Sequence, residues 1–572
     1  MAVESQQPVG THARRSHARL LDRWGPAAVL AALSALAVGV ALHAGRGLTF
    51  FFDEWNFILE RRGISLETFL EPHGGDHPAV LPVAAYKVML QVFGLGSYVP
   101  YRLLVIAVHI ACALLLYAYA RPRLGRWVAL APAALLLFLG AAWQDILWPF
   151  QIGFLGSLAA GLGMLLALDA ERPRDWLVSL LLLASLLCSS LGVIFVVAAA
   201  IELARDRPRL LARAWIVVVP VVLVGVIYLG YGGDGPERQL AAPGTAVRFA
   251  LDMAAAGTGA LGGLGLDWGR PLLVAAAALL AALLWRRPAV PVRIVALGAG
   301  AIAFWLLTGV SRAEWEPPVP PETSRYIYPS ALLVLLLFVT ALAGRRPPRA
   351  PAAAALAIGV ALACVSGAGV LGDGGGGLRT VSAAVLPQLT ALEAARDVVD
   401  PTLTIDPERS PGLVAGRYLD AVESFGSPAP SIEEVRAEPG AAAAFDAALV
   451  RAEGLALQPA QEPESGTGAA PTVEAAAGGT PDEADGCVEF DSQGSGAALD
   501  VQLPVGAVTV TLDAGPVAEL RLRRLSESWP GAATMQLGPN GTGRLAVPAD
   551  AVPGTWHLRL SPRQDARVCS AP

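Results

Sequence analysis

Long apolar runs dominate the first two thirds of this 572-residue chain. A helix needs about 20 apolar residues to cross a bilayer, and nearly charge-free runs of that length recur over residues 26–372. Because 54% of the residues are hydrophobic and only 16% are charged, a string of soluble domains is excluded. We therefore expect a mainly α-helical, polytopic membrane protein. Its predicted spans lie near 26–44, 101–120, 127–142, 150–168, 214–231, 271–285, 294–310, 329–343 and 352–372.

The composition indicates the kind of genome that encodes the chain and excludes one class of binding partner. Of 42 basic residues only Lys87 is a lysine, and Ala, Gly and Pro are abundant, which indicates a GC-rich, bacterial genome. The net charge is −6, and the acids gather in the C-terminal third. No basic tract is present, so nucleic-acid binding is excluded and membrane lipids are the expected surroundings.

The stretch 176–204 decides the predicted topology. As one helix it would place the arginine-rich loop 203–213 outside, whereas two short helices broken at 189–192 return the chain to the cytoplasm. With two short helices, the segments predicted on the cytoplasmic side hold 19 arginines in 65 residues. The loops predicted on the outer side then hold 9 basic residues in 118. Basic residues favour the cytoplasmic side. We therefore predict about eleven spans, N-terminus in and C-terminus out, with a cytoplasmic tail 1–25 and two short spans inside the bundle.

Two further apolar stretches carry charges. Residues 78–96 contain Lys87, and residues 245–266 contain Arg248 and Asp252. Such patterns are typical of amphipathic helices in the membrane interface. We place both at the outer interface, the first of them within an outer loop 45–98, and a membrane-spanning role is the alternative.

The C-terminal third predicts soluble structure. We expect an extracytoplasmic helical segment 373–457, which starts with a glycine run, and then a flexible Ala/Pro/Glu/Gly-rich linker 458–486. Residues 487–572 alternate between apolar and polar side chains, separated by Gly, Pro and Asn turns. This pattern predicts a small β-sandwich.

The cysteines give an independent indication of the compartment. Cys487 and Cys569 are the only two of five cysteines outside predicted spans, and they bracket the predicted sandwich. We expect them to form a disulfide, which requires an oxidising, extracytoplasmic location. Two unpaired buried thiols are the alternative.

An acidic pair marks the first outer loop. Asp53 and Glu54 lie between aromatic residues at the outer end of the first predicted span. An ionised side chain at a membrane boundary costs free energy, so such a carboxylate is a candidate for a functional role. The alternative is a pair that stabilises the N-terminus of a following helix, 56–62.

With this pair, an interfacial-helix pattern, a short-helix hairpin and Ser324-Arg325-Tyr326-Ile327-Tyr328-Pro329 before a late span, residues 26–345 resemble the glycosyltransferase C superfamily. That superfamily includes protein O-mannosyltransferases, the lipid A aminoarabinose transferase and actinobacterial arabinofuranosyltransferases. The resemblance implies a polyprenyl-phosphate sugar as donor. It also implies that the first-loop acid is the catalytic base, which would be Asp53, with Glu54 as the second choice.

The residues agree with this chemistry. A carboxylate takes the proton of the acceptor hydroxyl, and bidentate arginine suits the departing phosphate. Arg325, beside Tyr326, is the first candidate for phosphate binding, and Lys87 and Arg102 are further candidates. Interfacial snorkelling is the alternative for all three cations.

Two outer loops carry candidate sugar- or acceptor-binding residues. Indole rings and polar side chains of this kind suit sugar recognition, although tryptophans also anchor membrane interfaces. A metal site is the alternative in the first loop, but the Gly-Gly and Pro around its histidines indicate a loop, so we predict no metal or cofactor. The candidates are Trp55, His73, Asp76, His77, Trp143, Asp145, Trp148 and Gln151.

The sequence therefore predicts an inverting membrane glycosyltransferase that acts on a cell-envelope glycan, lipid or protein at the outer face. The rival is a non-enzymatic transporter or flippase of envelope lipids or glycans. Transport predicts ionisable groups along a path at mid-membrane, whereas here the acids gather at the outer boundary and His109 is the main mid-span exception.

Overall fold

The computed structural model divides the chain into two compact units. The helical unit comprises Met1–Arg46, Gly63–Tyr86 and Val99–Leu378, and the C-terminal unit comprises Gly47–Arg62, Lys87–Tyr98 and Arg379–Pro572. The structure describes residues 10–75, 77–205, 207–232, 240–346, 348–460, 468–494, 496–506, 508–515, 518–529, 533–537, 540–550 and 552–571.

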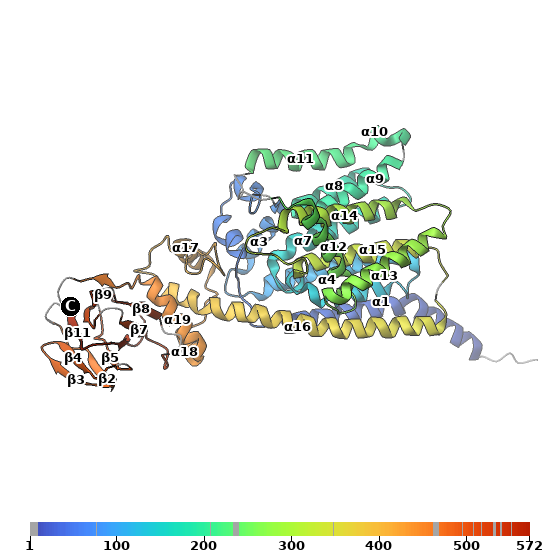
Figure 1. The fold of residues 1–572 in the computed structure, drawn as a ribbon. Helices are drawn as coiled ribbons and strands as arrows, with labels where there is room; N and C mark the ends of the chain where they lie inside the picture. The colour runs from blue at the N-terminus through green and yellow to red at the C-terminus, as the bar shows by residue number, and fades with distance from the viewer. Residues whose placement is uncertain are drawn as a thin grey trace, which may run out of the picture. The chain divides into compact units, whose positions relative to one another are not determined.

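Helices of very different lengths make up the first part of the chain (Figure 1). Short 3-10 turns lie between several of them. The α-helices are α1 (Gly10–Ala44), α2 (Glu67–Leu70), α3 (Val80–Phe93), α4 (Val99–Leu124), α5 (Leu130–Leu137), α6 (Trp143–Leu147), α7 (Ile152–Leu168), α8 (Asp175–Cys188), α9 (Val193–Arg205), α10 (Leu210–Arg213), α11 (Trp215–Tyr231), α12 (Pro243–Ala260), α13 (Leu266–Trp285), α14 (Val292–Arg312), α15 (Ser324–Ala341) and α16 (Ala350–Ala394).

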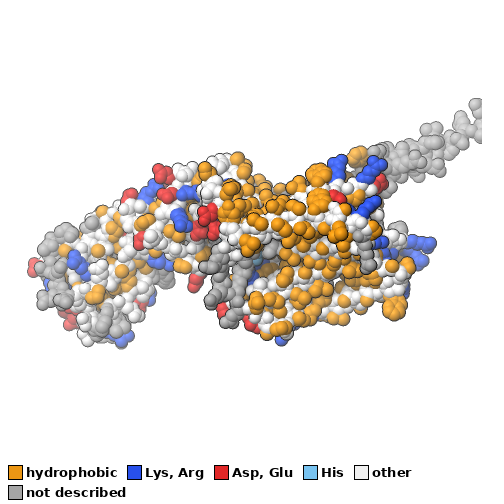
Figure 2. Space-filling view, turned by 90° about the horizontal axis from the view of Figure 1, so that it is seen from above, with side chains coloured by type: hydrophobic (Ala, Val, Ile, Leu, Met, Phe, Trp, Pro, Cys, Tyr) orange, Lys and Arg blue, Asp and Glu red, His pale blue; other side chains and the backbone are white. Residues whose placement is uncertain are grey.

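Several of these helices suit a bilayer. Within the described residues, seven are long and apolar enough to cross a membrane, and the bent pair of α5 with 140–147 makes an eighth candidate. In α13 and α16 only 11% of the most apolar window is buried, so their apolar side chains face outward, as lipid contact requires. Figure 2 shows hydrophobic side chains covering the visible face of the helical unit. These candidates fall short of the eleven predicted spans, partly because α8 and α11 contain only 14 and 17 residues.

The predicted break within 176–204 is confirmed. Helix α8 ends at Cys188, Ser189 takes an extended conformation, and its side chain accepts a hydrogen bond from the backbone N–H of Leu191. Helix α9 then starts at Val193. A serine that offers its side chain to the backbone favours a helix boundary over a helix interior.

The interfacial prediction for 245–266 is wrong. Helix α12 is buried along nearly its whole second half and packs against α13, α14 and α15. Small residues permit this close packing, since a Cβ on Gly257 would come within 2.4 Å of the Cβ of Ser330. The charge of Asp252 is paired with Arg270 at 2.8 Å, so it does not require an interfacial position.

The predicted boundary at 372–373 is also wrong, because α16 continues through the glycine run to Ala394. The glycines allow close approach of neighbouring elements. A Cβ on Gly374 would lie 2.2 Å from the indole of Trp143, and one on Gly375 would lie 2.2 Å from the carbonyl oxygen of Ala44. Packing therefore outweighs the low helix propensity of glycine.

The C-terminal unit contains the predicted helical segment and two antiparallel sheets. Its helices after α16 are α17 (Ala415–Phe425), α18 (Ile432–Ala437) and α19 (Pro439–Ala452). The six-stranded sheet has the order β1-β9-β6-β11-β4-β3, and the five-stranded sheet has the order β2-β5-β10-β7-β8. The strands are β1 (Gln458–Pro459), β2 (Thr472–Ala477), β3 (Gly479–Ala484), β4 (Cys487–Ser492), β5 (Ala498–Gln502), β6 (Val508–Asp513), β7 (Glu519–Arg523), β8 (Ala533–Gln536), β9 (Thr542–Val547), β10 (His557–Ser561) and β11 (Ala566–Ala571).

Part of the predicted linker 458–486 belongs to these sheets. Strand β2 pairs with β5, and β3 pairs with β4, each at the edge of its sheet. The side chains of β2 are almost all exposed. Its alanine-rich sequence, TVEAAA, has small side chains and no alternation of apolar and polar residues, and for this reason it resembled a flexible linker. The sheet region therefore begins before residue 487.

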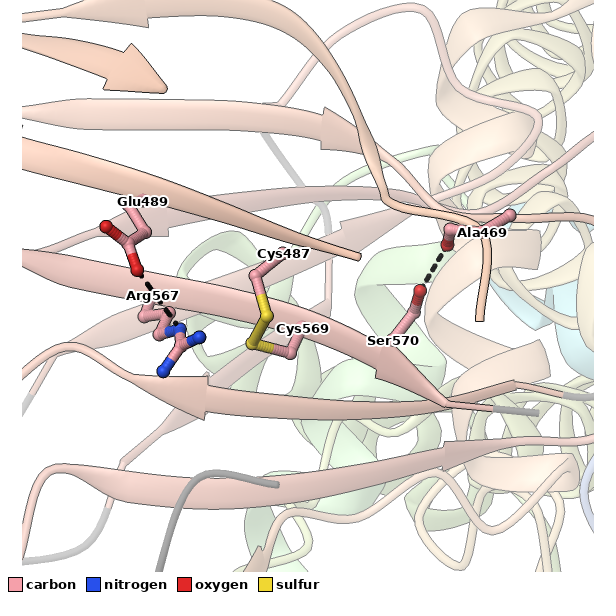
Figure 3. Close-up of a disulfide and its surroundings, with 6 residues drawn as sticks. All are labelled: Ala469, Cys487, Glu489, Arg567, Cys569 and Ser570. Atoms are coloured by element: carbon pink, nitrogen blue, oxygen red, sulfur yellow. Dashed lines mark hydrogen bonds and ion pairs between the residues drawn. A yellow bond between two sulfur atoms is a disulfide. The ribbon is translucent and has the colours of Figure 1, made fainter. Parts of the chain in front are cut away.

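The predicted disulfide is confirmed (Figure 3). Cys487 of β4 and Cys569 of β11 are directly opposite each other in the six-stranded sheet. Arg567 and Glu489 pair across the same strands at 3.4 Å. The other cysteines, Cys112, Cys188 and Cys364, are free thiols.

A buried carboxyl group joins α19 to the sheets. The Glu453 side chain is fully buried and lies 3.8 Å from the Arg524 guanidinium, which also binds Asp550 through two bonds of 2.5 and 2.7 Å. Burial, followed by the hydrogen bond and charge of Asp550, raises the pKa of Glu453 to about 9. This carboxyl group is therefore protonated at neutral pH.

The Glu453 environment predicts a pH-dependent stability of the C-terminal unit. Its pKa in the folded state lies above the value of about 4.3 expected in an unfolded chain, so the folded state retains a proton that the unfolded state loses. Stability contributed by this group should fall as the pH rises between those two values. Glu453→Gln cannot ionise, and its stability should change less over pH 5–9. Hydrogen exchange of α19 and β7, corrected for intrinsic rates, measures the difference.

The matched control is Glu527→Gln, at an exposed position in the same unit. It should follow the wild-type pH dependence. Identical pH profiles for Glu453→Gln and the wild type would contradict the assigned protonation.

Candidate functional site

The acidic segment belongs to the C-terminal unit, where residues from far along the chain hold it. It precedes the π-helix η1 (Asn56–Glu60). The backbone N–H of Thr49 donates to the Ser382 hydroxyl at 3.2 Å, and the backbone N–H of Phe52 donates to the carbonyl of Arg409 at 2.9 Å. Residues 47–62 and the C-terminal helical segment therefore form one structure here.

Asp53 and Glu54 have different environments. Glu54 is fully buried, and one of its carboxylate oxygens accepts hydrogen bonds from the Tyr98 hydroxyl at 2.8 Å and the Phe51 backbone N–H at 3.2 Å. Asp53 is half-buried, and its carbonyl accepts the N–H of Asn56. Since an incoming hydroxyl cannot reach the enclosed Glu54 carboxylate without displacing its donors, Asp53, the more exposed of the two acids, remains the first candidate for the base. The second-choice role of Glu54 as base is not supported.

The backbone beside Asp53 is strained. Phe52 has a φ of 52°, in the left-handed region that bulky residues avoid. Such a conformation costs on the order of 1–3 kcal/mol and is found preferentially at functional sites. Its hydrogen bond to Arg409 helps to retain it.

Trp55, a predicted sugar-binding residue, lies in an enclosed place. Its side chain is fully buried, with its ring 5.7 Å from that of Tyr418 and 5.8 Å from that of Phe50. Gly412 also lies against it. Trp55 therefore packs the core that holds the acidic segment.

Lys87 and Arg102, the two further candidates for phosphate binding, have different surroundings. Lys87 is half-buried in the C-terminal unit, where burial and then the charge of Arg61 lower its pKa. Arg102, in the helical unit, is 4% exposed and donates to the carbonyls of Ala41 and Leu42 at 3.0 Å each. It thereby satisfies the C-terminal end of α1. These bonds give Arg102 a structural role, and phosphate binding by Arg102 stays a prediction.

The histidine loop of the helical unit is a tight turn, as predicted. His73 and His77 form a β-bridge, and Gly74 and Gly75 between them have positive φ angles of 59° and 77°. Asp76 lies outside the described residues. Among the described residues, no group of three or more His, Cys, Asp and Glu side chains could hold a metal ion.

His77 is a neutral hydrogen-bonding partner. Its Nε2 lies 2.9 Å from Nη2 of Arg312, and its Nδ1 lies 3.2 Å from the Ser190 hydroxyl. A guanidinium only donates, so Nε2 accepts and the proton is on Nδ1. Burial, followed by the charges of Arg312, His73 and Arg325, lowers the pKa of His77 to about 3.

Arg325 is a cation without a carboxylate partner among the described residues. It follows the first residue of α15, is half-buried, and its guanidinium lies 5.4 Å from the centre of the buried Tyr326 ring. Its charge acts on Arg312 and on His77. Two arginines that repel each other in a partly buried place favour the binding of an anion.

The segment 143–151 is more buried than a sugar-stacking loop requires. Trp148 is 3% exposed and stacks on Phe150 at 5.0 Å, so the structure gives it a packing role. Trp143 is half-buried beneath the glycine run of α16. Asp145 and Gln151 are 0% and 2% exposed.

Arg312 lies at the end of α14, next to the aromatic, charged loop before α15, and this composition is a weak sequence signal. The sequence analysis did not single out Tyr98 or Arg409. Tyr98 and Arg409 have no local signal, because their contacts with the acidic segment depend on the fold of the C-terminal unit.

The chain was also compared with known proteins. A scan against protein-family models finds no match, and a comparison with curated proteins finds none either.

Proposed function

We propose that this protein is an inverting, integral-membrane glycosyltransferase. It takes a sugar from a polyprenyl phosphate and transfers it to a cell-envelope acceptor on the extracytoplasmic face of a bacterial membrane. The observation that carries the proposal is Arg325, a half-buried cation that makes no ion pair with a described carboxylate and lies within electrostatic range of Arg312. A phosphate group matches this arrangement.

In the proposed reaction, Asp53 accepts the proton of the acceptor hydroxyl while that oxygen attacks the anomeric carbon. The bond from the anomeric carbon to the phosphate oxygen breaks, and the lipid phosphate leaves as an anion. Arg325 stabilises the charge that develops on this phosphate. Lys87 remains a candidate for contacts with the donor phosphate.

The disulfide supports the outer face as the place of reaction. Asp53 and the Cys487–Cys569 bond belong to the same compact unit. Since stable disulfides form in oxidising compartments, Asp53 should lie on the extracytoplasmic side as well.

One observation favours the rival transporter function, since Asp145 and His109 are two ionisable side chains buried within the helical unit. However, both ring nitrogens of His109 are occupied, one by the Tyr328 hydroxyl at 2.9 Å and one by the Leu137 carbonyl at 3.2 Å. His109 is therefore a satisfied core histidine. Asp145 alone does not make a charged path.

The function is tested by transfer from labelled polyprenyl-phosphate sugars in membranes that contain the protein. Arg325→Ala should lower kcat/KM by about 100- to 1000-fold, as loss of one donor to a developing anion does. Arg325→Lys should recover part of this loss because it restores the charge without the bidentate geometry.

Arg270→Ala is the matched control, because Arg270 is half-exposed and pairs with Asp252. It should leave transfer unchanged. Full activity of Arg325→Ala would contradict the phosphate-binding role, and absence of label transfer from every donor by the wild type would contradict the function itself.

A further inference from the structure

Asp145 is a buried carboxylate without a hydrogen-bond partner. Its side chain is 0% exposed, and among the described residues neither carboxylate oxygen accepts a hydrogen bond. Leaving such a group unpaired costs far more than the net gain from an ordinary hydrogen bond. A protein that keeps it there has a use for it in another state, such as one with a ligand bound.

The fold places Asp145 near Arg325 without pairing them. The backbone N–H of Gln144 donates to the Ser324 hydroxyl at 3.0 Å, and the backbone N–H of Arg325 donates to the Gln144 side-chain carbonyl at 3.2 Å. These reciprocal bonds fix α6 to the start of α15. The charge of Arg325 acts on the Asp145 carboxylate, but the two groups form no ion pair.

The missing partners define the chemistry of a ligand. The oxygens of a carboxyl group accept hydrogen bonds, and Oε1 of Gln151, an amide 2% exposed in the same segment, is a second buried acceptor without a partner among the described residues. A ligand at these atoms must therefore offer donors. Arg325 only donates, so the same ligand must present an anion to it.

We propose that Asp145 binds hydroxyl groups of the sugar whose phosphate Arg325 binds. The inference rests on the proposed function and narrows it: the donor carries free hydroxyls on the transferred sugar, and segment 143–151 recognises the donor sugar rather than the acceptor. Gln151 provides a second acceptor for the same ring.

The test compares two kinds of probe on the full-length protein in lipid nanodiscs. Farnesyl phosphate carries the phosphate alone, and farnesyl phosphates bearing mannose, glucose, galactose or arabinofuranose add a sugar. For Asp145→Asn, the best sugar-bearing probe of the wild type should lose about tenfold or more in affinity, because one of the two accepting oxygens is replaced by an NH2 group that cannot accept from a hydroxyl. Affinity for farnesyl phosphate should stay unchanged. Asp267→Asn, which removes a charge from a fully exposed carboxylate of α13, should change neither.

The outcomes separate the possible roles. Equal weakening of both probes would make Asp145 a positioning residue for Arg325 and overturn the inference, as would unchanged affinity for both. If no sugar strengthens binding to the wild type, the proposed function fails and the inference fails with it.

A second measurement needs no ligand. Asp145→Leu should raise the unfolding temperature of the ligand-free protein, since it removes a buried polar group that has no hydrogen-bond partner among the described residues. A lower unfolding temperature in this variant would show that Asp145 is a structural group and overturn the proposal.

Discussion

Asp53→Asn is expected to reduce glycosyl transfer by about 100- to 10,000-fold, the range that a positioned general base contributes. Asparagine has nearly the shape of aspartate but cannot take the proton of a hydroxyl. The backbone of the turn should be unaffected, because the hydrogen bond from Asn56 goes to the carbonyl of residue 53. Initial rates with saturating donor, at equal protein levels in membranes, measure the loss.

The neighbouring acid is the matched control. In Glu54→Gln, the side-chain oxygen can still accept from both the Tyr98 hydroxyl and the Phe51 N–H. Transfer should therefore fall by less than about tenfold, as expected when a hydrogen-bonding group is kept and only its charge is lost. The reverse order, with Glu54→Gln inactive and Asp53→Asn active, would assign the base to Glu54.

Loss of the disulfide is expected to have the largest effect on stability. Replacing Cys487 and Cys569 by serine opens a loop with a sequence separation of 82 residues. On the chain-entropy model this should destabilise the C-terminal unit by about 4 kcal/mol. Hydrogen exchange of β4 and β11 in the full-length protein should show correspondingly faster opening, because these strands carry the bond.

Hydrogen exchange of the wild type with and without a reductant tests the same prediction without a substitution. The reductant should accelerate exchange in the wild type toward the rate of the double variant and have no further effect on that variant. Cys364→Ser, which removes a free thiol, should resemble the wild type. Equal protection of β4 and β11 with and without the bond would contradict a stabilising role.

Local patterns predicted part of the fold correctly. The break at 189–192, the helices of the C-terminal segment and strands such as β5 and β10 follow from turn residues, periodicity and alternation. The disulfide followed from elimination among five cysteines. Except for the disulfide, the signal lies within a few neighbouring residues in each case.

Other features depend on partners that the sequence does not place. Glycine run 374–377 stays helical because it packs closely, and β2 is a strand because β5 lies beside it. Helix α12 is buried because its small residues match those of its neighbours. Propensity alone predicted a break, a linker and an interfacial helix at these three places.

Sequence patterns likewise predicted only part of the candidate site. Residue type and position singled out Asp53, Arg325, His77 and Asp145, but they could not show that Glu54 and Trp55 are enclosed or that Arg102 is bound to α1. Those distinctions arise from burial, which depends on contacts between residues far apart in the sequence.

The hydrogen bonds from Thr49 to Ser382 and from Phe52 to Arg409 determine when the acidic turn can form during biosynthesis. The ribosome makes its partners only after more than 300 further residues. Until the end of α16 and the following loop have been synthesised, the turn lacks the groups that hold its backbone. A nascent chain that stops at residue 378 would thus contain Asp53 but not the scaffold that orients it, so activity should appear only late in synthesis.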